Sequence, residues 1–130
     1  MIHYLTVKEV LRIHQRVITT FGGAHGVRDL GLLESAVARP KAGFGDFEAY
    51  PTLVSKAAVL LHSLAANHAF VDGNKRTALV SCQTFLKRNG YMLQVDHQEL
   101  LTFVLEVAQS AIDETAIAEW LERHSQLREG

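Results

Sequence analysis

One stretch in the middle of the chain restricts the possible folds more than any other. Residues 53–65 read LVSKAAVLLHSLA, and apolar side chains cover most of the surface that a helix would have there. These side chains are Leu53, Val54, Ala57, Ala58, Leu60, Leu61, Leu64 and Ala65. A helix that is apolar on so many sides must be surrounded by other elements. We therefore expect this helix to lie at the centre of the fold.

Helical spacing of apolar residues recurs before and after the central segment. We predict further helices from Thr6 to Gly22, from Asp29 to Arg39, from Thr77 to Asn89, from Asp96 to Ala108 and from Asp113 to Leu121. Residues 91–95 look extended but short, and the polar tail from Glu122 to Gly130 is expected to fray. The predicted fold is all-α: a compact bundle of about six helices with at most a tiny extended or hairpin segment.

Length, charge and cysteine content narrow the function classes. With 130 residues, 48% of them hydrophobic, the chain is expected to form a single domain, residues 1–130, with a real core. A net charge of −1 argues against direct binding of nucleic acid. The lone Cys82 excludes an internal disulfide and fits a reducing cytoplasm, and its apolar neighbours indicate a core position. Neither a membrane span nor a signal peptide is evident, so we expect a cytoplasmic protein.

The central helix runs into the loop His68–Arg76, which reads HAFVDGNKR and opens the next helix. A turn that begins a helix presents unpaired N–H groups and the positive end of the helix dipole, which attract anions. Gly73 permits a positive φ and a close approach of the backbone, and Asn74 suits a turn or cap. Lys75 and Arg76 then add two full positive charges where phosphate oxygens would lie. This part of the loop indicates phosphate binding.

The first half of the loop carries groups for acid–base and metal chemistry. Histidine titrates near neutral pH, so His68 is a candidate general base. Asp72 is a candidate Mg2+ ligand, because Mg2+ usually takes one or two carboxylates together with substrate phosphates. Each residue alone could be structural, but their combination at one helix start favours a functional site. We expect Phe70 and Val71 to anchor the loop in the core instead.

The loop resembles the motif H-x-F-x-D/E-G-N-G/K-R of the Fic/Doc superfamily, and its lysine-containing form resembles the Doc (death-on-curing) toxins. Further segments similar to Doc sequences are Phe21–Gly23, Leu32–Ala36, Pro40 and Tyr50–Leu53. The resemblance implies an all-helical toxin that modifies a protein hydroxyl with a nucleoside triphosphate. It assigns His68 as the base, Asp72 to Mg2+, and Gly73, Asn74, Lys75 and Arg76 to the phosphates of ATP.

The resemblance also bears on which group is transferred. AMP-transferring members usually carry glycine at the position of Lys75, and often a second arginine at the position of Leu79. Both departures favour a kinase that moves the γ-phosphate of ATP to a Ser or Thr hydroxyl. The implied target is a translation factor such as elongation factor Tu, so that translation is arrested. Two alternatives remain open: an AMP transferase, and a non-catalytic module that binds nucleotide or antitoxin.

A partner is implied as well, because Doc-like toxins pair with a Phd-like antitoxin. Residues Lys41–Tyr50 break the helical pattern and contain Phe44, Phe47 and Tyr50. Two interpretations have equal weight: a mobile flap near the active site that receives a partner or target, or a connector whose aromatic side chains are buried. Separately, Ser125–Gly130 matches the S/T-x-x-x-E-G/N pattern of an autoinhibitory helix in some Fic proteins. The pattern is short, and we interpret the match as chance.

Overall fold

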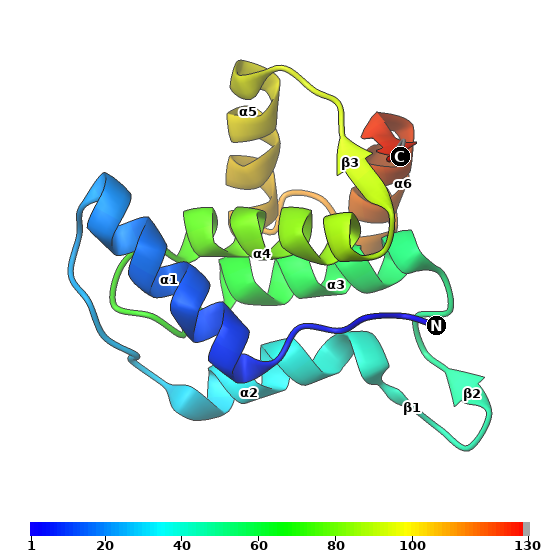
Figure 1. The fold of residues 1–130 in the computed structure, drawn as a ribbon, viewed down its shortest axis with the longest axis horizontal. Coiled ribbons are helices and arrows are strands. Elements are labelled where there is room, and N and C mark those ends of the chain that lie inside the picture. The colour runs from blue at the N-terminus through cyan, green and yellow to red at the C-terminus, as the bar shows by residue number, and fades with distance from the viewer. Residues whose placement is uncertain (129–130) are drawn as a thin grey trace.

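Six α-helices make up most of residues 1–128, the part of the chain that the computed structural model describes (Figure 1). They are α1 (Val7–Phe21), α2 (Leu30–Ala38), α3 (Leu53–Ala66), α4 (Asn74–Arg88), α5 (His97–Ala108) and α6 (Glu114–His124). The remaining elements are a 3-10 turn, η1 (Arg39–Lys41), and the strands β1 (Gly43–Phe44), β2 (Phe47–Glu48), β3 (Tyr91–Leu93) and β4 (Ser125–Leu127). These strands form two two-stranded sheets. The all-α prediction is confirmed.

Helix α3 is the centre of the fold, as its sequence predicts. Leu60, Leu61 and Leu64 are each at most 2% exposed, and α2, α4, α5 and α6 all pack against the helix. Even Lys56 is buried, because its Nζ donates to a carboxylate oxygen of Glu48 at 2.8 Å and to a backbone carbonyl at 3.2 Å. Burying a leucine-sized side chain contributes about 1.5–3 kcal/mol, so this helix organises the core.

Side-chain caps set the starts of five helices. Thr6 and Thr52 begin α1 and α3 with capping boxes, in which the cap hydroxyl accepts the N–H three residues on. Asp29, Asp96 and Asp113 cap α2, α5 and α6 through their carboxylates. Such a cap contributes about 1 kcal/mol. The start of α4 has no side-chain cap, and this difference matters for the site.

Residues 43–48 form a hairpin, so the interpretation as a connector with buried aromatic side chains is wrong. Strands β1 and β2 pair antiparallel, with Phe44 78% exposed and Phe47 57% exposed, so these rings are not buried in the core. Tyr50 is half-buried, and its hydroxyl accepts a hydrogen bond from Arg39 at 2.6 Å. The hairpin adjoins the N-terminal end of α3, whereas the His68 loop leaves its C-terminal end (Figure 1). A 14-residue helix is about 21 Å long, so the hairpin is not a flap beside that loop.

The C-terminal segment forms helix as far as His124 and a strand at Ser125–Leu127, so the prediction of fraying from Glu122 is wrong. Strand β4 pairs antiparallel with β3, with Leu93 opposite Ser125 and Tyr91 opposite Leu127. The Arg128 N–H also donates to the Gly90 carbonyl at 2.8 Å. Ser125–Leu127 is therefore a strand and not a helix, while residues 129–130 of the autoinhibitory pattern lie outside the described part. Within residues 1–128, no helix is long and apolar enough to cross a membrane.

Candidate active site

Residues 67–73 connect α3 to α4 and carry His68 at the C-terminal end of α3 (Figure 1). The His68 side chain is exposed, and its backbone has a φ of +53°. Helices often end with a residue in this left-handed region, but it is usually glycine. For other residues the conformation costs roughly 1–2 kcal/mol, so surrounding contacts must hold it.

The connection between α1 and α2 supplies those contacts from one side. The Arg28 guanidinium donates through Nε to the His68 carbonyl at 2.7 Å and through Nη2 to the Asn67 carbonyl at 3.3 Å. The backbone N–H groups of Arg28 and Asp29 both donate to the Ala69 carbonyl, at 2.8 and 3.0 Å. A β-bridge between residues 27 and 70 continues this pairing. The backbone around His68 is thus attached to residues some 40 positions earlier in the chain.

Buried aromatic rings hold the loop from the other side. Phe70 is 2% exposed and stacks on the ring of His14, with 3.8 Å between ring centroids. His14 lies in the core, and its Nε2 donates to the Asp72 carbonyl at 2.8 Å. The anchoring role predicted for Phe70 is confirmed. Val71 is 52% exposed, so its predicted anchoring role is wrong.

The Asn74 side chain closes the loop onto itself. Its Nδ2 donates to the Phe70 carbonyl at 2.9 Å, and its Oδ1 accepts the Phe70 N–H at 3.0 Å. These two hydrogen bonds hold the Asn74 amide against the backbone of Phe70, a structural role that the sequence did not predict. The backbone N–H of Asn74 lies at the first position of α4 and points in the same direction as the other N–H groups of the first helical turn.

The Asp72 carboxylate is exposed and oriented. One oxygen, Oδ2, accepts the Ala24 N–H at 2.8 Å, so the second oxygen remains available for a ligand. A Cβ at position 23 would lie 3.3 Å from the Cβ of Asp72, so Gly23 allows this close approach. One free carboxylate oxygen fits an Mg2+ ion that takes its other ligands from phosphate and water.

The start of α4 is open for an anion. Gly73 occupies the N-cap position with a φ of +77° and provides no capping side chain. This positive φ favours glycine, and a Cβ there would also lie 2.9 Å from Cδ1 of Ile18, whose side chain would have to shift. Lys75 and Arg76 are exposed on the first turn, and the Arg76 guanidinium lies over the Phe21 ring, 3.9 Å from its centroid. Uncapped N–H groups, the helix dipole and two cations therefore converge.

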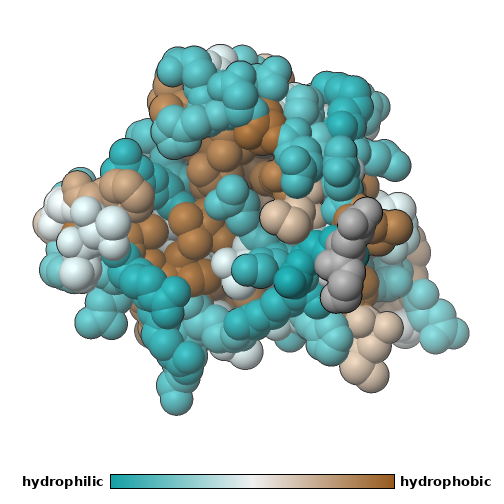
Figure 2. Space-filling model, turned by 45° about the horizontal axis from the view of Figure 1, so that its top comes forward, coloured by the Kyte–Doolittle hydropathy of each residue, from teal (hydrophilic) through white to brown (hydrophobic). Residues whose placement is uncertain are grey.

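These groups share a cavity of about 460 Å³. Five of the predicted site residues, Asp72–Arg76, line it together with the glycines at the end of α1. The rest of its lining is apolar and consists of Leu79 from α4 and Leu101, Val104 and Leu105 from α5. Figure 2 shows apolar side chains gathered in a hollow on the face that carries α5. The sequence predicted the helix that carries the α5 residues but not their place in this cavity, because nothing local marks them as part of a site.

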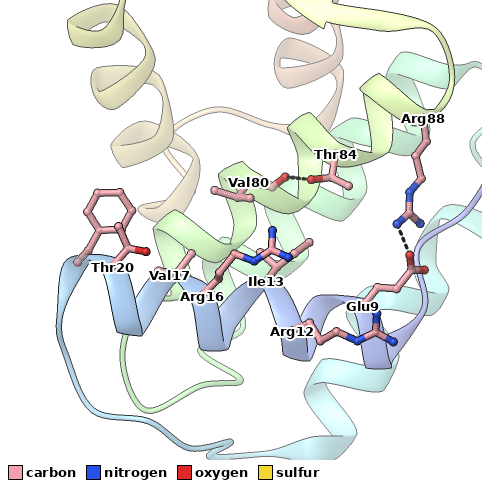
Figure 3. A pocket seen from close by; sticks show the side chains of 10 residues that line it. Glu9, Arg12, Ile13, Arg16, Val17, Thr20, Val80, Thr84 and Arg88 are labelled. Carbon is pink, nitrogen blue, oxygen red and sulfur yellow. Dashed lines mark hydrogen bonds and ion pairs between the residues drawn. The ribbon is translucent and has the colours of Figure 1, made fainter.

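His68 does not line this cavity, and its exposed ring is open to a large substrate. A second concavity of about 270 Å³ lies between α1 and α4 (Figure 3). Arg12 and Arg16 project over it, and Glu9 pairs with Arg88 at one end. None of the predicted site residues lines it.

Comparisons with known proteins gave a family match and two similar sequences. The model of the Fic/DOC family matches residues 4–86, a range that includes the whole His68–Arg76 loop. The chain is 52% identical over 96 residues to Toxin Doc of Mycolicibacterium smegmatis, covering 74% of this chain and 72% of that protein. It is 32% identical over 120 residues to Protein kinase doc of Escherichia phage P1, covering 92% and 94%.

Proposed function

The chain belongs to the Fic/DOC family, and on that premise we propose that it is a Doc-type protein kinase and the toxin of a toxin–antitoxin pair. It transfers the γ-phosphate of ATP to a Ser or Thr hydroxyl of a target protein. The observation that carries this proposal is the uncapped start of α4, where Lys75, Arg76 and Asp72 line one cavity. That arrangement suits a triphosphate whose terminal phosphate is the group transferred.

His68 begins the reaction in this proposal. Its exposed ring takes the proton from the target hydroxyl, and the hydroxyl oxygen then attacks the γ-phosphorus. The bond to the β-phosphate oxygen breaks, and ADP leaves. A base on the open surface suits a macromolecular target, because the acceptor side chain reaches it without entering the cavity.

The residues of the cavity act on the phosphates. The free N–H groups at the start of α4 bind phosphate oxygens, with Gly73 keeping the backbone accessible and Asn74 bracing the turn. Lys75 and Arg76 neutralise the charge that develops on the transferring group. Asp72 would hold Mg2+, and a bound Mg2+ would offset the negative charge of the phosphates.

Lys75 favours transfer of the γ-phosphate over transfer of AMP. A side chain at this position narrows the space next to the helix start. In addition, the relative from Escherichia phage P1, 94% of whose length matches this chain, is named a protein kinase.

The proposed target is a translation factor such as elongation factor Tu, and the proposed regulator is a Phd-like antitoxin, since a similar protein is named Toxin Doc. The exposed Phe44 and Phe47 remain candidate partner contacts, although they lie far from the loop.

Two labelled forms of ATP test the proposal. Purified protein is incubated with Mg2+, elongation factor Tu and ATP labelled at either the γ- or the α-phosphate. We expect label in the target from the γ-form alone, and none from either form with His68→Ala. Transfer of the α-label would establish AMP transfer instead. A folded wild-type protein that transfers neither label to this factor or to other components of a translation extract would refute a kinase acting on translation.

A further inference from the structure

We propose that Arg28 is a positioning residue for His68, and this inference rests on the proposed function for its catalytic readout. Arg28 spans two successive carbonyls at the end of α3, 2.7 Å to that of His68 and 3.3 Å to that of Asn67. It does not line the phosphate cavity. Its effect on catalysis is therefore exerted through the backbone of the residue that bears the base.

Arg28 stabilises the C-terminal end of α3 in two ways. The last carbonyls of a helix lack partners within the helix and lie at the negative end of its dipole, so a cation that donates to them is doubly favourable. The planar guanidinium supplies two donors in a fixed fork, which matches two adjacent carbonyls. An ammonium group could reach either carbonyl but would not hold both in one geometry.

The conformation of His68 makes this support specific. With a φ of +53°, His68 occupies a region that non-glycine residues rarely adopt, and its ring direction depends on that backbone geometry. Arg28 and Asp29 also donate their backbone N–H groups to Ala69, the next residue. Removing the Arg28 side chain leaves those backbone bonds in place, so the variant should relax locally around residues 67 and 68.

The phosphate half of the site has separate supports. The Asp72 carboxylate is held by Ala24, its carbonyl by His14, and the turn before α4 by Asn74. None of these three contacts involves the Arg28 side chain. Loss of Arg28 should therefore impair the base while leaving ATP binding nearly unchanged.

Steady-state transfer assays with Arg28→Ala and Arg28→Lys test the inference, with Arg12→Ala as a matched control on an exposed arginine away from the loop. We expect Arg28→Ala to lower kcat about 10- to 100-fold, within the range that a positioned base contributes, with KM for ATP changed less than threefold. Arg28→Lys should recover part of kcat, and guanidinium ion at millimolar concentration should raise kcat of Arg28→Ala. A parallel rise in KM, or an unchanged kcat, would overturn the assignment.

Amide hydrogen exchange supplies a readout that needs no activity. In Arg28→Ala, exchange should accelerate at residues 67–70 and stay unchanged at residues 57–64 of α3. Uniformly faster exchange across α3 would mean general destabilisation and would contradict a positioning role; Arg28→Lys then repeats the comparison with less disturbance. If wild-type protein transfers no phosphate, the proposed function fails, yet the local exchange result still decides whether Arg28 holds His68.

Discussion

At the scale of single residues, His68 combines an exposed imidazole with a backbone conformation that most residues avoid. The cost of a left-handed φ is roughly 1–2 kcal/mol, and Arg28 together with the Ala69 carbonyl bonds offsets it. Strain of this kind persists where the surroundings impose it and is frequent at functional sites. A glycine would fit the turn better, and the proposed mechanism gives the imidazole a use at this position.

Two substitutions of His68 separate chemistry from conformation. Both His68→Ala and His68→Gly should abolish transfer, because each removes the base. Urea unfolding should find His68→Gly more stable than His68→Ala by about 1 kcal/mol, since glycine adopts a positive φ without a steric penalty. His97→Ala, which changes another exposed histidine, serves as the control and should retain activity. Persistent transfer by folded His68→Ala would remove this residue from the mechanism.

Asp72 and Arg76 should differ in how their loss depends on metal. Arg76→Ala should weaken binding of a non-hydrolysable ATP analogue with or without Mg2+, whereas Asp72→Ala should weaken it only when Mg2+ is present. Each lost charge-assisted hydrogen bond is worth about 1.5–3 kcal/mol, or roughly a tenfold to hundredfold change in affinity. Calorimetry measures both, with Arg16→Ala as the control. Equal affinity of wild type and Arg76→Ala would place Arg76 outside the site.

At the scale of elements, what could be predicted depended on how local the cause is. Helix starts at Asp29, Asp96 and Asp113 could be recognised because a cap lies within three residues of the N–H that it binds. The pairing of β3 with β4 joins residues more than 30 positions apart. Residues 91–95 looked extended in the sequence, but nothing at Ser125–Leu127 marked a partner strand. For the same reason, the roles of Arg28 and of the α5 residues that line the cavity could not be predicted, because their contacts join residues far apart in the sequence. The chemistry of the loop could be predicted from the sequence because its functional groups lie within nine consecutive residues.

The contact between α1 and α4 gives a prediction for pH. A hydrogen bond from the Arg88 side chain is the main cause that lowers the pKa of Glu9 from an ordinary value of 4.5 to about 2. Because the pKa is lower in the folded state, the pair stabilises the fold fully above pH 4.5, and this contribution disappears as the pH falls toward 2. The pair is partly exposed, so we expect less than about 1 kcal/mol.

Glu9→Gln isolates that contribution, because glutamine preserves the capping box with Thr6 and removes only the charge. Unfolding free energies measured between pH 2 and 7 should show wild type more stable at pH 7, with the difference shrinking below pH 4.5. Glu34→Gln, at an exposed glutamate of α2, should show no such convergence. A difference that does not change with pH would contradict the role of the Glu9–Arg88 pair (Figure 3).

At the scale of the whole molecule, α4 separates two regions with different tasks. Its N-terminal end forms the phosphate cavity, and its C-terminal end leads through Gly90 to β3, to which β4 attaches the end of the described chain (Figure 1). The 15 residues of α4 span about 22 Å. Changes at the strand pair should therefore alter stability without altering the site.

Deleting residues 125–130 tests this separation and also tests the autoinhibitory pattern at Ser125–Gly130. Loss of β4 removes its pairing with β3 and the Arg128 bond to Gly90, which together should cost about 1–3 kcal/mol. For a domain of this size the melting temperature should fall by roughly 4–12 °C. The kcat for transfer, measured well below the melting temperature, should remain within twofold of wild type, because Ser125–Leu127 forms a strand at the end of the molecule opposite the loop. Arg128→Ala, which keeps the strand, is the milder control and should change neither property strongly. A several-fold rise in kcat on deletion would show that this segment restrains the active site and that its match to the autoinhibitory pattern is functional.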